Sequence, residues 1–146
     1  MEQDSQTTQI RNGLLAKNDS QINYLSKKKN GTIYIASNYG LLSLDANDKV
    51  VQVYKDKFKK KPIYETIETL VVDKQGYLWL GSTSDGLIKM KPDNDNYQFE
   101  VFPITTNKIL SIIESNLNFI ICGTENHGLI IVNYNGEVQQ KYLHSK

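Results

Sequence analysis

Short apolar stretches recur along the chain in a fixed order. Each of three copies opens with two apolar residues three positions apart, and the openings lie 45 and then 42 residues apart: Ile22 and Leu25, Ile67 and Leu70, Ile109 and Ile112. After a polar turn comes a fully apolar or aromatic run, at residues 33–36, 78–81 and 120–123. A run this short between turns is typical of a strand that is buried on both faces.

A Gly-Leu pair marks the second half of each copy, at Gly40, Gly86 and Gly128. It closes a small polar loop and leads into another apolar strand, at residues 41–44, 87–90 and 129–132. A second turn then precedes a fourth strand with alternating character. That strand carries Val51 and Val53, Phe99 and Val101, and more weakly the residues 138–142. Alternation predicts one buried and one wet face, so we interpret this strand as an exposed outer edge.

The turns between the first and second strands have the composition that reverses a chain. They occupy residues 29–31, 74–76 and 115–118, and the first two contain a glycine. The third turn lacks glycine. We therefore expect Asn118 to adopt the left-handed backbone conformation there.

Four antiparallel strands per copy at this period predict an all-β fold of β-propeller blades. The chain would hold three four-stranded antiparallel blades, a partial propeller. Residues 1–20 would form a linker or the outer strand of a preceding blade, and the blades would span 21–65, 66–107 and 108–146. The small residues Ala36, Gly81 and Gly123 share one register, which indicates close approach of neighbouring blades. A helical solenoid is excluded because no segment has helical apolar periodicity.

The composition argues against two classes of partner, membranes and nucleic acids. The chain of 146 residues is 39% hydrophobic and 23% charged, with a net charge of +1. Its apolar runs are too short to insert into a membrane, and no secretory signal is evident at the start. Lysine-rich stretches at 27–29 and 55–61 could attract anions, but we interpret them as solvated loops. A nucleic-acid partner is not expected from so balanced a charge.

The middle copy closely resembles the two-component regulator propeller repeat. The resemblance covers the segment from Ile67 through Asp73, Gly76 and the run Leu78-Trp79-Leu80-Gly81-Ser82 to Gly86-Leu87, and departs only at Ser82, where threonine is usual. The other copies are looser. Tyr34 and Ile121 stand where Trp79 does, Ala36 replaces the glycine in the first, and Glu114 approximates Asp73.

Proteins similar to this are periplasmic sensor regions of hybrid two-component systems from gut Bacteroidetes. The resemblance implies carbohydrate sensing, a periplasmic location and dimerisation. Any histidine kinase output would lie outside these 146 residues.

Ligand-binding candidates lie at the position before each Gly-Leu pair: Tyr39, Asp85 and His127. By analogy, the loops that hold them converge with the loops between blades, 60–65 and 105–108, at one mouth of a propeller. Aromatic, acidic and imidazole groups could stack on or hydrogen-bond a sugar. The competing interpretation is that they are turn residues chosen for backbone geometry. Trp79 is interpreted as core packing, and Gly40, Gly86 and Gly128 as structural.

No constellation predicts catalysis, a metal site or a cofactor. His127 and His144 lie 17 residues apart, and Cys122 sits in an apolar strand where a thiol is usually inert. Asp93 and Asp95 fall in a turn without the other ligands of a calcium loop. We therefore expect a segment that is not an enzyme.

Three blades would not close a ring, since propellers typically have about 4 to 8. Either the chain is part of a larger propeller, or it self-associates, with two copies in a six-bladed ring as the simplest closed form. A ligand-sensing segment of a two-component sensor is the first functional hypothesis. A protein-interaction propeller without a small ligand is the second, and a propeller lyase or hydrolase fragment is the third.

Overall fold

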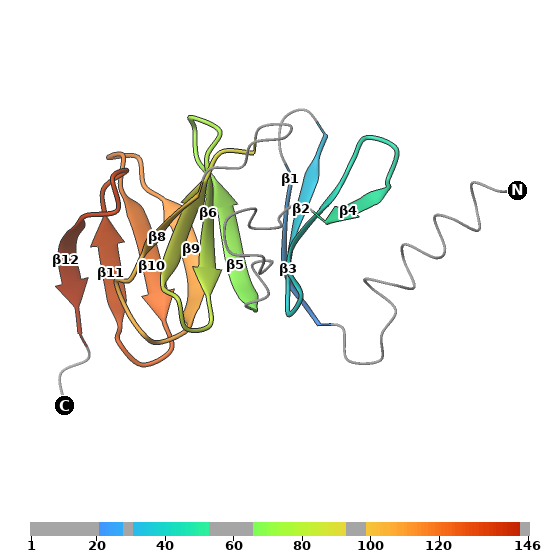
Figure 1. Cartoon of the computed structure of the whole chain (residues 1–146). Coiled ribbons are helices and arrows are strands. Elements are labelled where there is room, and N and C mark those ends of the chain that lie inside the picture. The colour runs from blue at the N-terminus through green and yellow to red at the C-terminus, as the bar shows by residue number, and fades with distance from the viewer. Residues whose placement is uncertain (1–20, 28–30, 53–65, 93–98, 144–146) are drawn as a thin grey trace, which may run out of the picture. The chain divides into compact units, whose positions relative to one another are not determined.

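The described part of the chain is built entirely from strands and turns. A computed structural model describes residues 21–27, 31–52, 66–92 and 99–143. Within them, twelve strands form three separate four-stranded sheets (Figure 1). No helix in this part is long and apolar enough to cross a membrane.

Each sheet is an antiparallel meander whose strand order follows the chain. The first comprises β1 (Ile22–Lys27), β2 (Ile33–Ser37), β3 (Gly40–Leu44) and β4 (Val50–Gln52). The second comprises β5 (Ile67–Val72), β6 (Leu78–Ser82), β7 (Leu87–Met90) and β8 (Phe99–Phe102). The third comprises β9 (Ile109–Glu114), β10 (Ile120–Thr124), β11 (Leu129–Val132) and β12 (Val138–Tyr142).

The sheets confirm the predicted all-β fold of four-stranded antiparallel units. Every predicted strand is present within a residue or two, and β1, β5 and β9 begin at the three isoleucines that open the copies. Asn118 has a φ of 66°, so the predicted left-handed turn residue is confirmed. Val53 and the lysine-rich stretch 55–61 lie outside the described residues.

The chain divides into two compact units, Met1–Thr66 and Ile67–Lys146. The first unit holds the sheet β1–β4. Its apolar cluster consists of buried Ile35 and Leu42, with Ile33 and Leu44 packed against them. The second unit holds the sheets β5–β8 and β9–β12, which pack face to face with β9 lying against β5 and β6.

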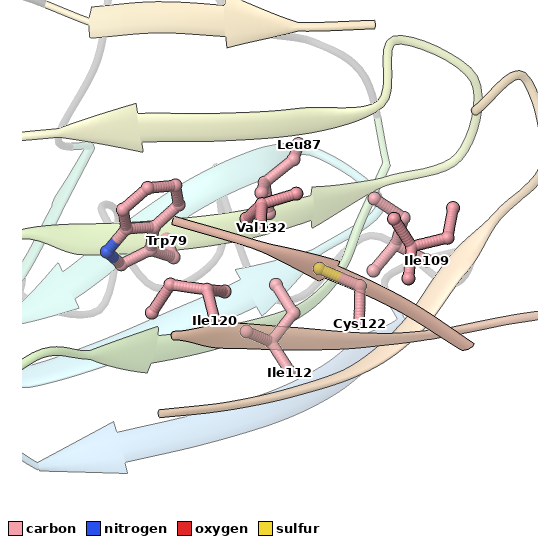
Figure 2. Close-up of a cluster of buried hydrophobic side chains, with 8 residues drawn as sticks. Trp79, Leu87, Ile109, Ile112, Ile120, Cys122 and Val132 are labelled. Carbon is pink, nitrogen blue, oxygen red and sulfur yellow. The ribbon is translucent and has the colours of Figure 1, made fainter. Parts of the chain in front are cut away.

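The interface between the two sheets of the second unit is a buried apolar cluster (Figure 2). The β5–β8 sheet contributes Trp79 and Leu87, which have no exposed surface. The β9–β12 sheet contributes its inward residues: Ile109, Ile112, Ile120, Cys122, Ile130 and Val132. The Phe102 ring stacks on the Trp79 indole, with centroids 6.1 Å apart, and extends the contact to the outer strand.

Close approach of the two sheets depends on Gly81. A Cβ at this position would lie 2.8 Å from both the Cγ2 and the carbonyl oxygen of Ile109, and 2.8 Å from the Thr69 side chain. Real Cβ atoms do not approach so closely. The backbone of β6 therefore accepts Ile109 of the following sheet directly onto its surface, as the small residue at this register predicted.

Asp73 joins the β5–β6 turn to the core. Its Oδ1 accepts hydrogen bonds from the backbone N–H groups of Gln75 and Tyr77, both at 2.9 Å. Its Oδ2 accepts a bond from the Trp79 indole N–H at 2.8 Å. Asp73 and Trp79 are both buried, so one carboxylate fixes the turn and satisfies the only polar atom of the indole side chain.

The structure corrects the predicted match between Glu114 and Asp73. In the third sheet, Ser115 occupies the turn position, and its Oγ accepts bonds from the backbone N–H groups of Leu117 and Phe119. The Glu114 carboxylate instead accepts a bond from the backbone N–H of Lys74, at 2.9 Å. The shorter side chain of Ser115 thus takes the place of Asp73 in the β9–β10 turn. The Glu114 carboxylate links this turn to the β5–β6 turn.

The fourth strands also differ from the expected alternation. In β8, Val101 is 46% exposed while Phe102 is half-buried, because Phe102 pairs with Leu87 and stacks on Trp79. All five residues of β12 are exposed. These strands are outer edges, as predicted, but neither has one buried and one wet face.

Replacing Asp73 by alanine tests its double role. Because the change leaves the indole N–H buried without an acceptor and frees two turn N–H groups, we expect Asp73→Ala to lower the free energy of unfolding by about 2–3 kcal/mol. Urea denaturation followed by Trp79 fluorescence measures this. Asn133→Ala is the matched control, since the Asn133 Oδ1 accepts the N–H groups of the exposed residues Asn135 and Glu137 in a turn of the same unit. An equal loss in the two variants would contradict the role of the indole bond.

Gly81→Ala tests the close approach of the sheets. The added methyl meets backbone and two side chains, so we expect a destabilisation of about 1–3 kcal/mol from overpacking. At Gly123, the equivalent position of the third sheet, an added Cβ would meet mainly the Ser111 hydroxyl. Because Ser111 is exposed and can rotate, Gly123→Ala should have a clearly smaller effect in thermal unfolding of the isolated chain. Equal effects would argue against the contact with Ile109 as the cause.

Candidate functional site

Three segments meet at one end of the second unit. They are the β6–β7 loop at residues 83–86, the β10–β11 loop at 125–128, and the segment 103–108 that joins β8 to β9. A Cβ on Gly86 would lie 2.4 Å from the Phe102 carbonyl oxygen, so the first loop lies directly against this joining segment. The Glu125 N–H donates to the Lys108 carbonyl oxygen at 2.9 Å, so the second loop does too.

A hydroxyl at the end of the second strand fixes each loop of this kind. Ser37, Ser82 and Thr124 donate from their hydroxyls to the carbonyl oxygens of Gly40, Gly86 and Gly128, at 2.9, 2.8 and 2.7 Å. The hydroxyl oxygens of Ser37, Ser82 and Thr124 in turn accept the backbone N–H groups of the candidate residues Tyr39, Asp85 and His127, at 3.1, 2.9 and 2.9 Å. Serine serves as well as threonine here, which accounts for Ser82.

The three candidate residues therefore have their backbone held by the turn. The following glycine takes a φ of 88°, 85° or 67°, a left-handed conformation that disfavours other residues. The side chains of Asp85 and His127 are exposed, and that of Tyr39 is half-buried. The turn thus requires a hydroxyl residue before the candidate position and a glycine after it. It places no requirement on the side chain of the candidate residue itself.

His127 is the candidate that the structure brings together with the segment between blades. The Thr105 hydroxyl lies 3.0 Å from the imidazole Nδ1, and the Asn107 amide nitrogen lies 3.0 Å from each ring nitrogen. Thr105 is buried, and its hydroxyl also accepts the backbone N–H of Asn107 at 3.0 Å. The exposed imidazole is thus held by polar neighbours, with one buried anchor beneath it.

Glu68 is a site residue that the sequence analysis missed. The pairing of β5 with β6 shifts register between Ile67 and Thr69, which marks a β-bulge at Glu68. Bulges re-aim side chains, and here the Glu68 carboxylate accepts a bond from the Thr83 hydroxyl at 3.1 Å. The signal available in the sequence is the position after each opening isoleucine, occupied by Asn23, Glu68 and Leu110.

Tyr39 belongs to the other unit, and its loop has the same local construction. The Asn38 side chain accepts the backbone N–H of Gln21 at 2.8 Å, and the Asn38 N–H donates to the Gln21 carbonyl oxygen at 3.1 Å. The loop 60–65, expected at the same mouth, lies outside the described residues. Asp85 and His127 thus lie in different loops of the second unit, and Tyr39 lies in the equivalent loop of the first.

The described part of the chain shows neither a group of metal ligands nor a reactive cysteine. No group of three histidine, cysteine, aspartate or glutamate side chains there is arranged to hold a metal ion. His144, Asp93 and Asp95 lie outside the described residues. Cys122 points into the apolar cluster (Figure 2), and burial raises the pKa of its thiol from 9.0 to about 12. A thiol so difficult to ionise is a poor nucleophile.

The fold is similar to solved structures of much larger proteins. The extracellular domain of the hybrid two component system BT4673 from B. thetaiotaomicron matches 86% of this chain with a TM-score of 0.65 and 22% identity. Virginiamycin B lyase from Staphylococcus aureus matches 90% with a TM-score of 0.70 and 11% identity. PorZ from Porphyromonas gingivalis matches 84% with a TM-score of 0.61 and 14% identity.

These matches and the three meandering sheets decide the architecture. The chain is a set of β-propeller blades. The resemblance to sensor propellers of hybrid two-component systems is borne out at the level of structure, since extracellular domains of such systems are among the similar structures.

The chain spans only part of each similar structure. It covers 17% of the BT4673 domain, 44% of the lyase and 21% of PorZ. No family model matches the sequence, and no curated protein matches it. At sequence identities this low, the similarity shows a common fold only. Function has to be inferred from the residues of the candidate site.

The buried thiol gives a direct test of the core beside the site. We expect Cys122 in the folded chain to be unreactive toward a disulfide reagent at pH 8, and to react fully once the chain is unfolded. Burial raises the pKa of the Cys122 thiol. The contribution of this thiol to the free energy of unfolding is therefore fully present below the ordinary pKa of 9.0 and is lost as the pH rises toward about 12. Cys122→Val should weaken this alkaline destabilisation. Fast labelling of the folded chain would contradict the packing.

Proposed function

We propose that this chain is a ligand-sensing segment of a two-component sensor region that lies outside the cytoplasm and binds a carbohydrate. The mouth formed by the β6–β7 loop, the β10–β11 loop and residues 103–108 is the proposed binding end. The similar structures of extracellular sensor domains support the sensor role and the location. The segment itself would bind, and signalling would be carried by other parts of the protein.

The convergence of polar side chains around His127 carries the proposal. Thr105, Asn107 and His127 come from two different loops and meet within hydrogen-bonding distance. Exposed Glu125 lies on the β10–β11 loop and exposed Asp85 on the β6–β7 loop, and both add carboxylate acceptors. Sugars are recognised by a few placed donors and acceptors on a preformed surface, and the hydroxyl-fixed loops supply that surface without further ordering.

Calorimetric titration with a panel of glycan oligosaccharides tests the proposal. We expect one class of oligosaccharide to bind, and His127→Ala and Asn107→Ala each to weaken binding about tenfold or more, as loss of a hydrogen bond to a ligand does. Asn116→Ala is the matched control, because Asn116 is an exposed turn residue at the opposite end of β10. A ligand whose affinity is unchanged by both site variants would contradict this mouth.

The reading frame that encodes these residues provides an independent test of the sensor role. We expect it to encode a membrane span and a histidine kinase in the same polypeptide. A frame that encodes neither would contradict the two-component assignment and leave a protein-interaction propeller as the better hypothesis.

The structural similarity to virginiamycin B lyase favours a second candidate, a propeller enzyme. His127 would be its general base, since it is the imidazole at the mouth. The oligosaccharides recovered after titration separate the two functions: intact sugars are expected for a sensor, and cleaved or unsaturated products for an enzyme.

A further inference from the structure

The first strand of every blade contains one extra residue. Strand pairing passes over Asn23 in β1, Glu68 in β5 and Leu110 in β9, and each of these residues directly follows the isoleucine that opens its copy. The three side chains are an amide, a carboxylate and an aliphatic group, yet the bulge recurs at the same place. The fold therefore requires the extra residue and does not require a particular side chain there.

The bulge explains why the opening apolar residues lie three positions apart. In a regular strand, residues three apart point to opposite faces of the sheet. In β9, however, Ile109 pairs with Thr124, and Ile112 pairs with Cys122 on the same face of β10. The extra residue thus puts both isoleucines on the buried face, where they are 0% and 5% exposed. Leu110 is left over from this packing, and its side chain is available for another purpose.

Glu68 lies at the mouth of the second unit. Ile67, which precedes it, pairs with Ser82, the last residue of β6, so the bulge lies beside the β6–β7 loop. The Glu68 side chain is half-buried, and its carboxylate accepts the Thr83 hydroxyl of that loop at 3.1 Å. A carboxylate can accept further hydrogen bonds besides this one. Glu68 is thus a positioned acceptor at the end of the strand.

Leu110 lies at the same end of the neighbouring strand. Ile109 pairs with Thr124, the last residue of β10, so this bulge lies beside the β10–β11 loop. Strand β9 packs against β5, and the two bulges therefore belong to adjacent strands. The Leu110 side chain is 48% exposed. Sugar rings have an apolar C–H face as well as hydroxyl groups, and binding sites combine apolar surface with a few placed polar groups.

The charges at this end are mainly negative. The three segments of the mouth and Glu68 together carry the carboxylates of Glu68, Asp85 and Glu125 against the single ammonium group of Lys108. Asp85 and Glu125 are exposed, whereas Lys108 is half-buried. Like charges brought together in a recognition site oppose binding, so a ligand that carries carboxylates meets repulsion here.

We propose that Glu68 and Leu110 contact the ligand of this mouth, and that Glu68 makes the mouth select neutral oligosaccharides over acidic ones. Glu68 accepts hydroxyl groups of the sugar, and Leu110 packs on its C–H face. The inference rests on the proposed function, because it assigns a ligand class to the same site. It adds to His127 and Asn107 two residues that the bulges, and not the loops, supply.

Calorimetric titration of the 146-residue chain at low ionic strength tests the selectivity. The probes are tetrasaccharides of glucose, galactose and mannose, each compared with its uronate, in which C6 is oxidised to a carboxylate. We expect the uronate of the sugar that binds to be about tenfold or more weaker than its neutral form. Glu68→Gln should reduce this difference at least about threefold, because it removes a charge and keeps an acceptor for Thr83.

Two further variants separate local from general effects. Glu100→Gln is the matched control, since Glu100 is exposed on the outer strand β8 and its loss changes the net charge equally. This control should leave the preference for the neutral sugar unchanged. Leu110→Ser should weaken the neutral sugar and its uronate alike, by about five- to tenfold, because it removes apolar contact and no charge. Thermal unfolding would verify that each variant is folded.

The outcomes separate this inference from the proposed function. A uronate that binds as tightly as its neutral form, or a preference that Glu68→Gln leaves unchanged, would overturn the role of Glu68 while carbohydrate binding stands. Unchanged affinity in Leu110→Ser would overturn the contact with Leu110. If neither the neutral sugars nor the uronates bind, the proposed function fails and this inference fails with it.

Discussion

The contact of Ile109 with the bare backbone at Gly81 sets the distance between neighbouring blades, and the rest of the structure depends on it. At this separation Trp79 and Leu87 pack on the inward residues of β9–β12 and are fully buried. The apolar second strand of a blade cannot be buried within its own sheet. Each blade therefore depends on its neighbour, which is why a stack of blades is stable and a single sheet is not.

Much of this fold was predictable because strand pattern and turn chemistry agree along the whole chain. The opening isoleucines, the turn at Asn118 and the three Gly-Leu pairs each have a local physical meaning that survives in the structure. The match of Glu114 to Asp73 was wrong because it rested on similar side chains. The structure depends instead on the position of the acceptor, and Ser115 satisfies the turn with a single oxygen.

Burial was predicted less well than strands, because burial depends on neighbours. β6 is buried along its whole length, whereas β10 alternates between buried and half-buried residues although its sequence is equally apolar. The difference comes from the covering sheet. The third sheet packs on the side of β6 that carries Trp79, whereas among the described residues no sheet covers the corresponding side of β10, where Ile121 is half-buried. A strand pattern states which faces can be buried and not which of them are.

The hydroxyls of Ser37, Ser82 and Thr124 explain why the position before each Gly-Leu pair can vary. A turn explanation and a binding explanation for Tyr39, Asp85 and His127 were alternatives as long as the side chains were thought to make the turn. In the structure, the preceding hydroxyl and the following glycine make it, and the candidate residue contributes only its backbone N–H. Its side chain can therefore change from tyrosine to aspartate to histidine without loss of the loop. Loops built in this way can vary the side chain that they present from blade to blade while the fold stays the same.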